Sequence, residues 1–238
     1  MDKQQVWYKD LGLIDYADAW AVQENLLAGN VVIKTEARAM GDAYDANVVA
    51  TKNHFLFCEH HPVYTLGKSG SEDNILYSLE ERLAKNISFF KTNRGGDVTF
   101  HGPQQLVGYP IMDLEKFGTD IGKYLRNIEE VIILAIADYG IKGERSKGET
   151  GVWIDAEKTG HERKICAIGV RCSRWITMHG FAVNVNTDLS YFDGIVPCGI
   201  QDKKVTSIKQ ELGRSVNFEA FKKVVRDKFS MVFDCELL

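Results

Sequence analysis

RGGDVTFHGPQQLVGYPIMD, residues 94–113, contains two β-prone runs, 97–101 and 106–113. Each run is preceded by a break, at 95–96 and at 102–103. Aromatic and β-branched residues favour strands, whereas the glycines and the proline at the breaks interrupt them. Two adjacent glycines also let a backbone come close to a ligand. The stretch therefore predicts short consecutive strands that carry a binding loop.

The flanking sequence extends this pattern in both directions. Further strands are predicted at His54–Glu59, Val63–Leu66, Ile87–Thr92, Gly151–Ile154, Lys164–Val170 and Trp175–Val185. Helices are predicted at Asp15–Gly29, from Ser78 toward Leu83, from Thr119 to Gly140, and at Thr206–Leu212 and Phe218–Phe233. Strands come in runs, without regular alternation with helices, so we expect an α+β fold with a mixed or antiparallel sheet covered on one face by helices.

Two of the helices have clear sequence signals. Ser78 followed by Glu81 forms a capping box, and the long helix after Thr119 has an apolar stripe that stops before Gly140. In the first helix Gly29 is the expected stop. Its residues near helical spacing are Ala17, Trp20, Ala21, Asn25 and Leu26.

Composition limits the class of protein. The chain has 238 residues, 45% of them hydrophobic, which is enough for a buried core, and we expect one domain over residues 1–238. Its apolar runs are shorter than the roughly 20 residues that span a bilayer, and the N-terminus lacks a signal or transit pattern, so we expect a cytoplasmic protein without a membrane segment. A net charge of −4 argues against nucleic acid as a partner.

Five cysteines form no CxxC pair, which fits reduced thiols better than disulfides or structural zinc. Cys58, His60 and His61 are the one metal-like cluster, but neighbours on a strand point to opposite faces, so we do not expect a metal there. The P-loop and Rossmann glycine patterns are also absent from the sequence.

Cys198 stands in a PCG turn, where a thiol can be exposed and reach a carbonyl carbon. The alternative is a small buried apolar residue, as we expect for Cys166 in the middle of a strand. A nucleophilic cysteine needs a base or a positive charge nearby. The candidates for that base are Lys164, His101, His179 and His161. Lys164 opens an apolar strand and is either partly desolvated or extended into solvent.

Several blocks together resemble one known family. RGGDVTFHGPQQLVGYP closely resembles the signature of the lipoyl(octanoyl) transferases, and HPVYTLG at His61 resembles the block that precedes it. GVWID at Gly151, KICAIGVR at Lys164, HGFAVNVNTDLSYF at His179 and IVPCGI at Ile195 follow in the family's order. The resemblance covers residues 58–208 and implies the biotin/lipoate protein ligase-like catalytic fold, which is related to class II synthetases.

The resemblance also implies site residues. Cys198 matches the family's acyl acceptor and Lys164 its partner. Residues matching the octanoyl site are Arg94, Gly95, Gly96, Asp97, Val98, Thr99, Phe100, His101, Ala167, Ile168, Gly169, Gly180, Phe181 and Ala182. Val98, Phe100 and Ile168 are the expected apolar neighbours of the chain. Two departures are Cys166, where alanine is usual, and a longer hairpin at residues 156–163 before the lysine.

The implied activity is transfer of octanoate from octanoyl-acyl carrier protein to a lysine of apo lipoyl domains, in 2-oxoacid dehydrogenase complexes and glycine cleavage H protein. It implies no cofactor and no metal, and we expect a monomer. An acidic carrier would dock on a basic patch, for which the candidates are Arg145, Lys147, Arg171 and Arg174. The alternatives are an ATP-dependent lipoate or biotin protein ligase and a noncatalytic module that binds the same partners.

Overall fold

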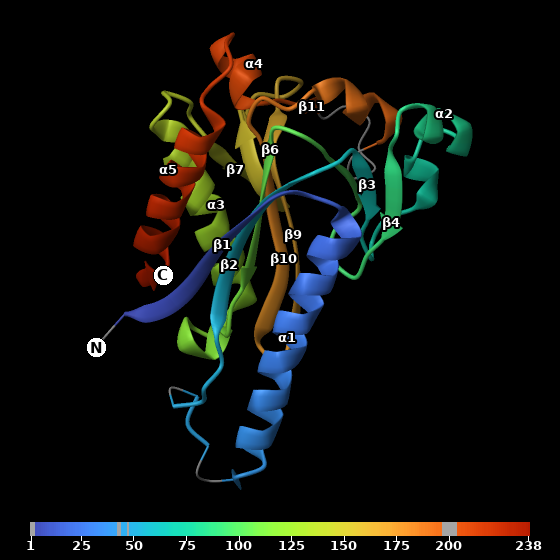
Figure 1. The fold of residues 1–238 in the computed structure, drawn as a ribbon. Coiled ribbons are helices and arrows are strands. Elements are labelled where there is room, and N and C mark those ends of the chain that lie inside the picture. The colour runs from blue at the N-terminus through green and yellow to red at the C-terminus, as the bar shows by residue number, and fades with distance from the viewer. Residues whose placement is uncertain (1–2, 42–43, 47, 197–203) are drawn as a thin grey trace.

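The computed structural model describes residues 3–41, 44–46, 48–196 and 204–238 (Figure 1). The strands are β1 (Gln4–Ile14), β2 (Asn53–His60), β3 (Val63–Leu66), β4 (Ser88–Lys91), β5 (Val98–His101), β6 (Gln105–Ile111), β7 (Glu144–Ser146), β8 (Glu149–Ile154), β9 (Arg163–Ser173), β10 (Ile176–Asn184), β11 (Lys204–Val205) and β12 (Cys235–Leu237). The helices are α1 (Tyr16–Arg38), α2 (Leu79–Ala84), α3 (Ile121–Ala137), α4 (Ile208–Leu212) and α5 (Phe218–Val232), with 3-10 turns η2 (Glu72–Asn74), η3 (Leu114–Lys116) and η4 (Leu189–Gly194).

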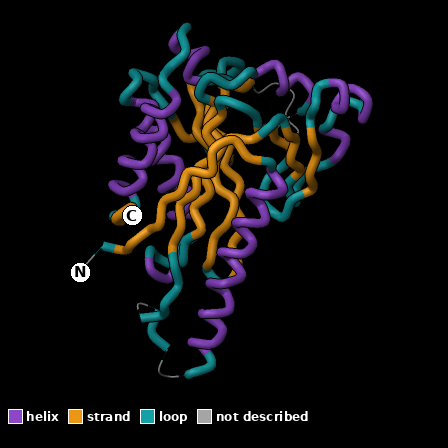
Figure 2. Tube along the Cα trace, viewed as in Figure 1, coloured by secondary structure: helices purple, strands orange, loops and turns teal. Residues whose placement is uncertain are grey.

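Most strands belong to one large mixed sheet (Figure 2). Among the described residues its order is β12-β1-β2-β6-β10-β9-β8-β7, with β11 beside β9. Pairing is antiparallel from β2 to β7, whereas β1 is parallel to both of its neighbours and β11 is parallel to β9. A second sheet, β4-β3-β5, stands beside the end of the first and contains the VTFH strand of the opening motif. The prediction of a mixed sheet is confirmed.

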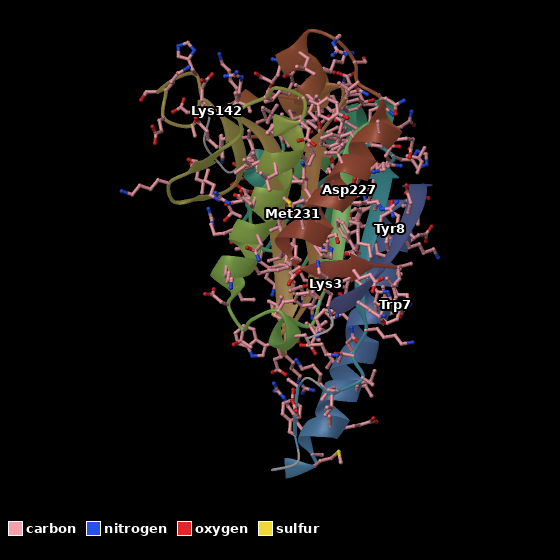
Figure 3. All side chains as sticks on the ribbon, turned by 90° about the vertical axis from the view of Figure 1, so that its left-hand side faces the viewer. Lys3, Trp7, Tyr8, Lys142, Asp227 and Met231 are labelled. Atoms are coloured by element: carbon pink, nitrogen blue, oxygen red, sulfur yellow. The ribbon has the colours of Figure 1, made fainter. Side chains whose placement is uncertain are left out.

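Helices cover both faces of the large sheet, which corrects the expectation of one covered face. The main core lies under α3 and α5, where Ile132 and Phe229 are fully buried. Figure 3 looks onto this side, with Asp227 and Met231 marking α5 and Tyr8 marking β1 beside it. A second apolar cluster lies under α1, where Ala19 and Leu27 pack on the other face. Tyr16 at the start of α1 contacts Phe90 of β4 and His101 of β5, so the smaller sheet meets the α1 face.

The buried stripe of α1 differs from the predicted one. Its buried residues are Tyr16, Ala19, Gln23, Leu27, Asn30 and Lys34, and the helix continues past Gly29 to Arg38. Half of this stripe is polar, so hydrophobic spacing could not find it. Each polar member has a distant partner that makes its burial tolerable: Lys34 Nζ, for example, lies 2.6 Å from Asp113 Oδ1. An exposed glycine is compatible with a helix interior at a modest cost.

The other predicted elements agree with the structure to within a few residues, and the Ser78–Glu81 capping box closes in both directions. β1 was missed because only Val6 of its 11 residues is buried, which leaves little apolar alternation to detect. No helix in the described part of the chain is both long and apolar enough to cross a membrane.

Candidate active site

A cavity of about 500 Å³ lies between residues of β9, β10 and β6 on one side and the loop before β5 on the other. It brings together most of the residues that the sequence singled out. Those lining it are Arg94, Gly95, Gly96, Asp97, Val98, Thr99, His101, Lys164, Ala167, Ile168, Gly169, His179, Gly180, Phe181 and Ala182. Segments more than 80 residues apart in the sequence therefore form one site.

Small side chains form the floor of the cavity. In the antiparallel ladder of β9 and β10, Gly169 is opposite Gly180 and Ala167 is opposite Ala182. Paired residues of a ladder place their side chains on the same face. Because all four are glycine or alanine, this part of the lining, which we call the trough, presents little side-chain volume and no polar side-chain atom, and Lys164 lies on the same strand.

The RGG loop forms the facing wall. Arg94 Nη2 donates to the backbone oxygen of Thr65 at 2.6 Å and to its hydroxyl at 2.9 Å, which ties the guanidinium to β3. Gly95 N donates to the Val170 oxygen of β9 at 2.9 Å. A Cβ added at Gly169 would come within 2.8 Å of the Gly95 oxygen, so the loop and the floor are already in close contact. This approach requires glycine at position 169.

Phe100 differs from the other predicted contacts. Its ring belongs to the buried cluster of the small sheet, stacked on Tyr191 at 4.8 Å between ring centroids and packed edge-on to Tyr64. The expectation that it borders the acyl chain is corrected, because its ring is enclosed in this cluster, whereas Val98, Thr99 and His101 of the same strand line the cavity.

Lys164 begins the trough and is half-buried, not extended into solvent. It is register-paired with Trp153 of β8, and its Nζ lies 4.5 Å from the centre of the Trp153 ring. On the other side Val205 of β11 pairs with it. Preceding it, Arg163 bonds Asp155 and Glu211 through side chains, both at 2.6 Å. These contacts hold the start of β9, so the longer hairpin at residues 156–163 ends on a fixed strand.

His101 is a buried, neutral member of a hydrogen-bond chain. Gln105 Nε2 donates to the Phe100 oxygen and to Asn184 Oδ1, so its Oε1 accepts from His101 Nδ1 at 2.8 Å. Burial lowers the pKa of His101 well below its usual value, with the charges of neighbouring groups adding to the effect. His101 Nε2 then carries a lone pair, 3.4 Å from Thr65 Oγ1.

His179 is also buried and neutral, and its backbone has φ +58°. Burial, and then the charge of Arg94, lowers its pKa to about 3. Its Nε2 lies 2.7 Å from Asn93 Oδ1. Both histidines therefore line the cavity without positive charge at neutral pH, which leaves Lys164 as the basic side chain among the three candidates gathered there.

Cys198 lies outside the described residues. The segment on its N-terminal side is held at Val196, whose N donates to the Asn74 oxygen at 2.8 Å, and by the bridge between Ile75 and Ile195. On its C-terminal side the described chain resumes in β11 and pairs with Lys164 through Val205, which lines the cavity. Both borders of the PCG segment thus connect to elements around the site.

The remaining sequence candidates lie elsewhere. His161 is exposed in the hairpin and does not line the cavity, and Cys166 is fully buried as predicted. His60 Nε2 faces the hydroxyl of Tyr109 at 2.8 Å and Cys58 Sγ at 3.4 Å, whereas His61 is exposed. Within the described ranges, no group of three or more His, Cys, Asp or Glu side chains is placed to hold a metal.

The four basic residues predicted to form one docking patch do not form one. Arg145 makes ion pairs with Glu129 and Glu130 of α3, at 3.1 and 2.5 Å, whereas Arg171 pairs with Glu24 of α1 at 2.9 Å. Because α1 and α3 lie on opposite faces of the sheet, the patch is wrong as proposed. Charge alone could not show which residues were already neutralised.

Further residues complete the lining. They are Tyr16, Gln105, Val107, Tyr109, Leu125, Glu149, Thr150, Val170, Asn184, Phe192 and Val205. Alternation along the predicted strand 106–113 could have identified Val107 and Tyr109, which face the same way. Tyr16 had no local signal, because it comes from the start of α1.

Comparison with known proteins identifies the family of this chain. The family model described as the lipoyl protein ligase A/B catalytic domain matches residues 15–230. A protein of Christiangramia forsetii named octanoyltransferase is 52% identical over 235 residues, covering 98% of each chain. One of Flavobacterium psychrophilum with the same name is 53% identical over 231 residues, covering 97% of each.

Solved structures show the same fold at low identity. A bipartite lipoate protein ligase from Thermoplasma acidophilum aligns with a TM-score of 0.66 at 15% identity, covering 100% of this chain and 86% of that one. A biotin protein ligase from Aquifex aeolicus, in complex with biotin and ATP, aligns with a TM-score of 0.51 at 13% identity, covering 98% and 71%. The predicted biotin/lipoate ligase-like fold is confirmed.

Proposed function

Because the chain belongs to the lipoyl protein ligase A/B catalytic-domain family and, within it, to the octanoyltransferases, we propose that it transfers octanoate from octanoyl-acyl carrier protein to a lysine of apo lipoyl domains. The acceptors are the lipoyl domains of 2-oxoacid dehydrogenase complexes and the glycine cleavage H protein. The transfer is the first step of protein lipoylation from endogenous octanoate, and it takes place in the cytoplasm.

The observation that carries this proposal is the trough that starts at Lys164. Its volume of about 500 Å³ lies in the usual range for small-ligand sites. Glycine and alanine at the paired positions add little side-chain bulk and no polar side chain to the cavity. Seven carbons at about 0.8 kcal/mol per methylene contribute roughly 5 to 6 kcal/mol of binding before ordering costs.

In the first half-reaction the Cys198 thiolate attacks the thioester carbonyl carbon of the octanoyl carrier. A C–S bond to Cys198 forms, the C–S bond to the carrier breaks, and the carrier leaves as a thiol. Lys164 takes the proton from Cys198 and gives it to the departing sulfur. Support for this role is the position of Lys164 at the head of the trough, beside the strand that follows the PCG segment.

In the second half-reaction the amine of the lipoyl-domain lysine attacks the octanoyl-enzyme. The amide C–N bond forms, the C–S bond to Cys198 breaks, and the proton lost by the amine returns to the sulfur through Lys164. Thioester exchange is nearly balanced and amide formation is downhill, so neither step consumes ATP. Backbone N–H groups around the trough are suitable donors to the developing oxyanion.

The alternative is an ATP-dependent ligase, since one of the aligned structures is a biotin ligase in complex with ATP. That likeness concerns the fold alone at 13% identity, whereas the octanoyltransferases are about half identical over nearly the full length. A ligase would activate a free acid and would have no use for a thiol in a PCG turn.

Intact-mass measurement separates these functions. The protein is mixed with octanoyl-acyl carrier protein without ATP, and we expect an octanoyl adduct that hydroxylamine removes and that then moves to an added apo lipoyl domain. Cys198→Ala should form no adduct, whereas Cys172→Ala, which changes an exposed cysteine away from the cavity, should react like the wild type. Transfer that requires ATP and free octanoate would overturn the proposal in favour of a ligase.

A further inference from the structure

We propose that Glu129 of α3 is a positioning residue for Lys164. Its carboxylate holds the backbone of Gly151 in β8, and the Lys164 side chain lies across that glycine in the lining of the cavity. This inference deepens the proposed function and rests on it, because it takes Lys164 as the proton-transfer partner of Cys198.

Glu129 is a carboxylate without solvent exposure, and its two oxygens have separate partners. Oε2 forms ion pairs with Arg126 and Arg145, at 2.6 and 3.1 Å, whereas Oε1 accepts from the backbone N of Gly151 at 3.0 Å. Both arginines reach the surface, with side-chain exposures of 43% and 37%, so water can replace the buried oxygen as their partner. Gly151 is buried, so its N–H has no such replacement.

Gly151 forms part of the surface on which the Lys164 side chain lies. A Cβ added at position 151 would be 3.5 Å from Lys164 Cε and 3.7 Å from its Cδ, and only 2.7 Å from the Cys166 oxygen. The φ of +132° at this residue also favours glycine. Trp153 faces the same way two residues later, with its ring centre 4.5 Å from Lys164 Nζ. A shift of Gly151 would therefore move Lys164.

A β-bulge in β9 turns Lys164 to the cavity side. Two neighbouring residues of β8, Val152 and Trp153, pair with residues of β9 that are two apart, Cys166 and Lys164. Ile165 is the extra residue, and both it and Cys166 belong to the core under α3 and α5. Regular alternation from Cys166 would place residue 164 in that core as well. The direction of Lys164 thus depends on how β8 and β9 meet at this point.

The bond from Glu129 fixes β8 at the same point. The outer neighbour of β8 in the sheet is β7, a strand of three residues whose register with β8 is also irregular. The bond to Gly151 ties β8 to α3, which packs on the main core. Without it we expect Gly151 to shift relative to β9 and to displace the Lys164 amine. A displacement of about 1 Å at a positioned group can slow a reaction about 100-fold.

Two variants separate the bond to Gly151 from the negative charge of the carboxylate. Glu129→Asp keeps the charge for the two long arginines, but it is one methylene too short to hold its oxygen at Gly151 N. Glu129→Gln loses the charge, but it keeps the length and an oxygen that accepts from Gly151 N. If the bond positions Lys164, the glutamine variant should behave like the wild type and the aspartate variant should not.

The readout is alkylation of Cys198 by iodoacetamide as a function of pH, followed by peptide mass spectrometry. A Cys172→Ala background removes the exposed thiol. The reagent reacts with the thiolate, so its rate reports how well Lys164 supports that form. In Glu129→Asp we expect the apparent pKa of Cys198 to rise toward about 8.5 and the rate at pH 7 to fall at least about fivefold, while the rate at pH 9.5 stays within about twofold of the wild type.

The ratio of the two rates separates positioning from general damage, because a smaller folded fraction would change both rates alike. Octanoyl-enzyme formation at pH 7 should fall at least about tenfold in Glu129→Asp. Glu130→Asp is the matched control, since it makes the same exchange at the next residue of α3, which is partly exposed and pairs with Arg145. Both this control and Glu129→Gln should keep the wild-type pH profile.

A wild-type profile in Glu129→Asp would contradict the inference. A Glu129→Gln profile shifted as far as that of Glu129→Asp would contradict it too, because the charge would then act and not the bond to Gly151. Lys164→Ala tests the proposed function separately. If its profile equals that of the wild type, Lys164 does not serve Cys198 and the proposed function is wrong in this step. If it shifts and Glu129→Asp does not, the inference alone fails.

Discussion

Gly169→Ala should damage the site without removing any functional group. An ideal Cβ at position 169 lies 2.8 Å from the Gly95 oxygen and 3.3 Å from Arg94 Cδ. Ordinary contacts to a Cβ are 3.4–4 Å, so the RGG loop must move away. The loop resists this movement, because Gly95 N donates to the Val170 oxygen at 2.9 Å and the Arg94 side chain is bonded to Thr65.

Overpacking of this kind costs about 1–3 kcal/mol. In urea titrations we expect the free energy of unfolding of Gly169→Ala to fall by that amount. The kcat/KM for octanoyl transfer should fall by at least about fivefold, and by more than kcat does. Gly29→Ala is the matched control, since it lies exposed in α1 with no heavy atom near its ideal Cβ, and it should stabilise the protein by up to about 1 kcal/mol. If Gly169→Ala keeps both wild-type stability and wild-type transfer, the close approach of loop and floor is not what shapes the cavity.

Three further predictions concern charged and titrating groups. Lys164→Ala should slow formation of the octanoyl-enzyme by about 10²- to 10⁴-fold at neutral pH, as followed by quenched-flow mass spectrometry, and an unaltered rate would remove Lys164 from proton transfer. Lys34→Met leaves the buried Asp113 carboxylate without its cation, so the free energy of unfolding should fall by about 3–5 kcal/mol, whereas Lys223→Met, at an exposed ion pair, should change it little. Burial lowers the pKa of His60 to about 4 and of His179 to about 3, and that of His101 well below its usual value. The unfolded chain binds more protons than the native one below pH about 6.5, so stability is complete above that pH and falls on acidification toward pH 4, by up to about 1.4 kcal/mol per pH unit for each ring. A urea midpoint that is equal at pH 7 and pH 5 would show that these rings are not held neutral.

Local sequence patterns predicted correctly those features that lie within one continuous segment of the chain. Three such features are the glycines of the RGG loop, the strand that Lys164 opens and the apolar stripe of α3. In the structure, each lies within a few residues of its predicted position. The capping box of α2 is likewise a matter of four consecutive residues. The order of the motifs along the chain indicated one family. It could not show how close the RGG loop lies to β9 and β10.

Pattern failed where burial depended on a distant partner. α1 buries Gln23, Asn30 and Lys34, whose partners come from β10, from the chain before β2 and from the N-cap of η3. A rule that assigns polar residues to solvent selects the wrong helix face in this case. The predicted basic patch failed similarly, because Arg145 and Arg171 are neutralised by acids that are distant in sequence.

By itself, the sequence determined the chemical groups of this protein and the local backbone that presents them: a loop of two glycines, a lysine at the start of a strand and small residues at alternate positions of two later strands. Only the tertiary structure decided how they meet. The register that places Gly169 opposite Gly180, and the left-handed turn that brings His179 onto the α1 side, depend on pairing between strands and on α1. Such pairing is a property of long-range packing, which no window along the chain contains.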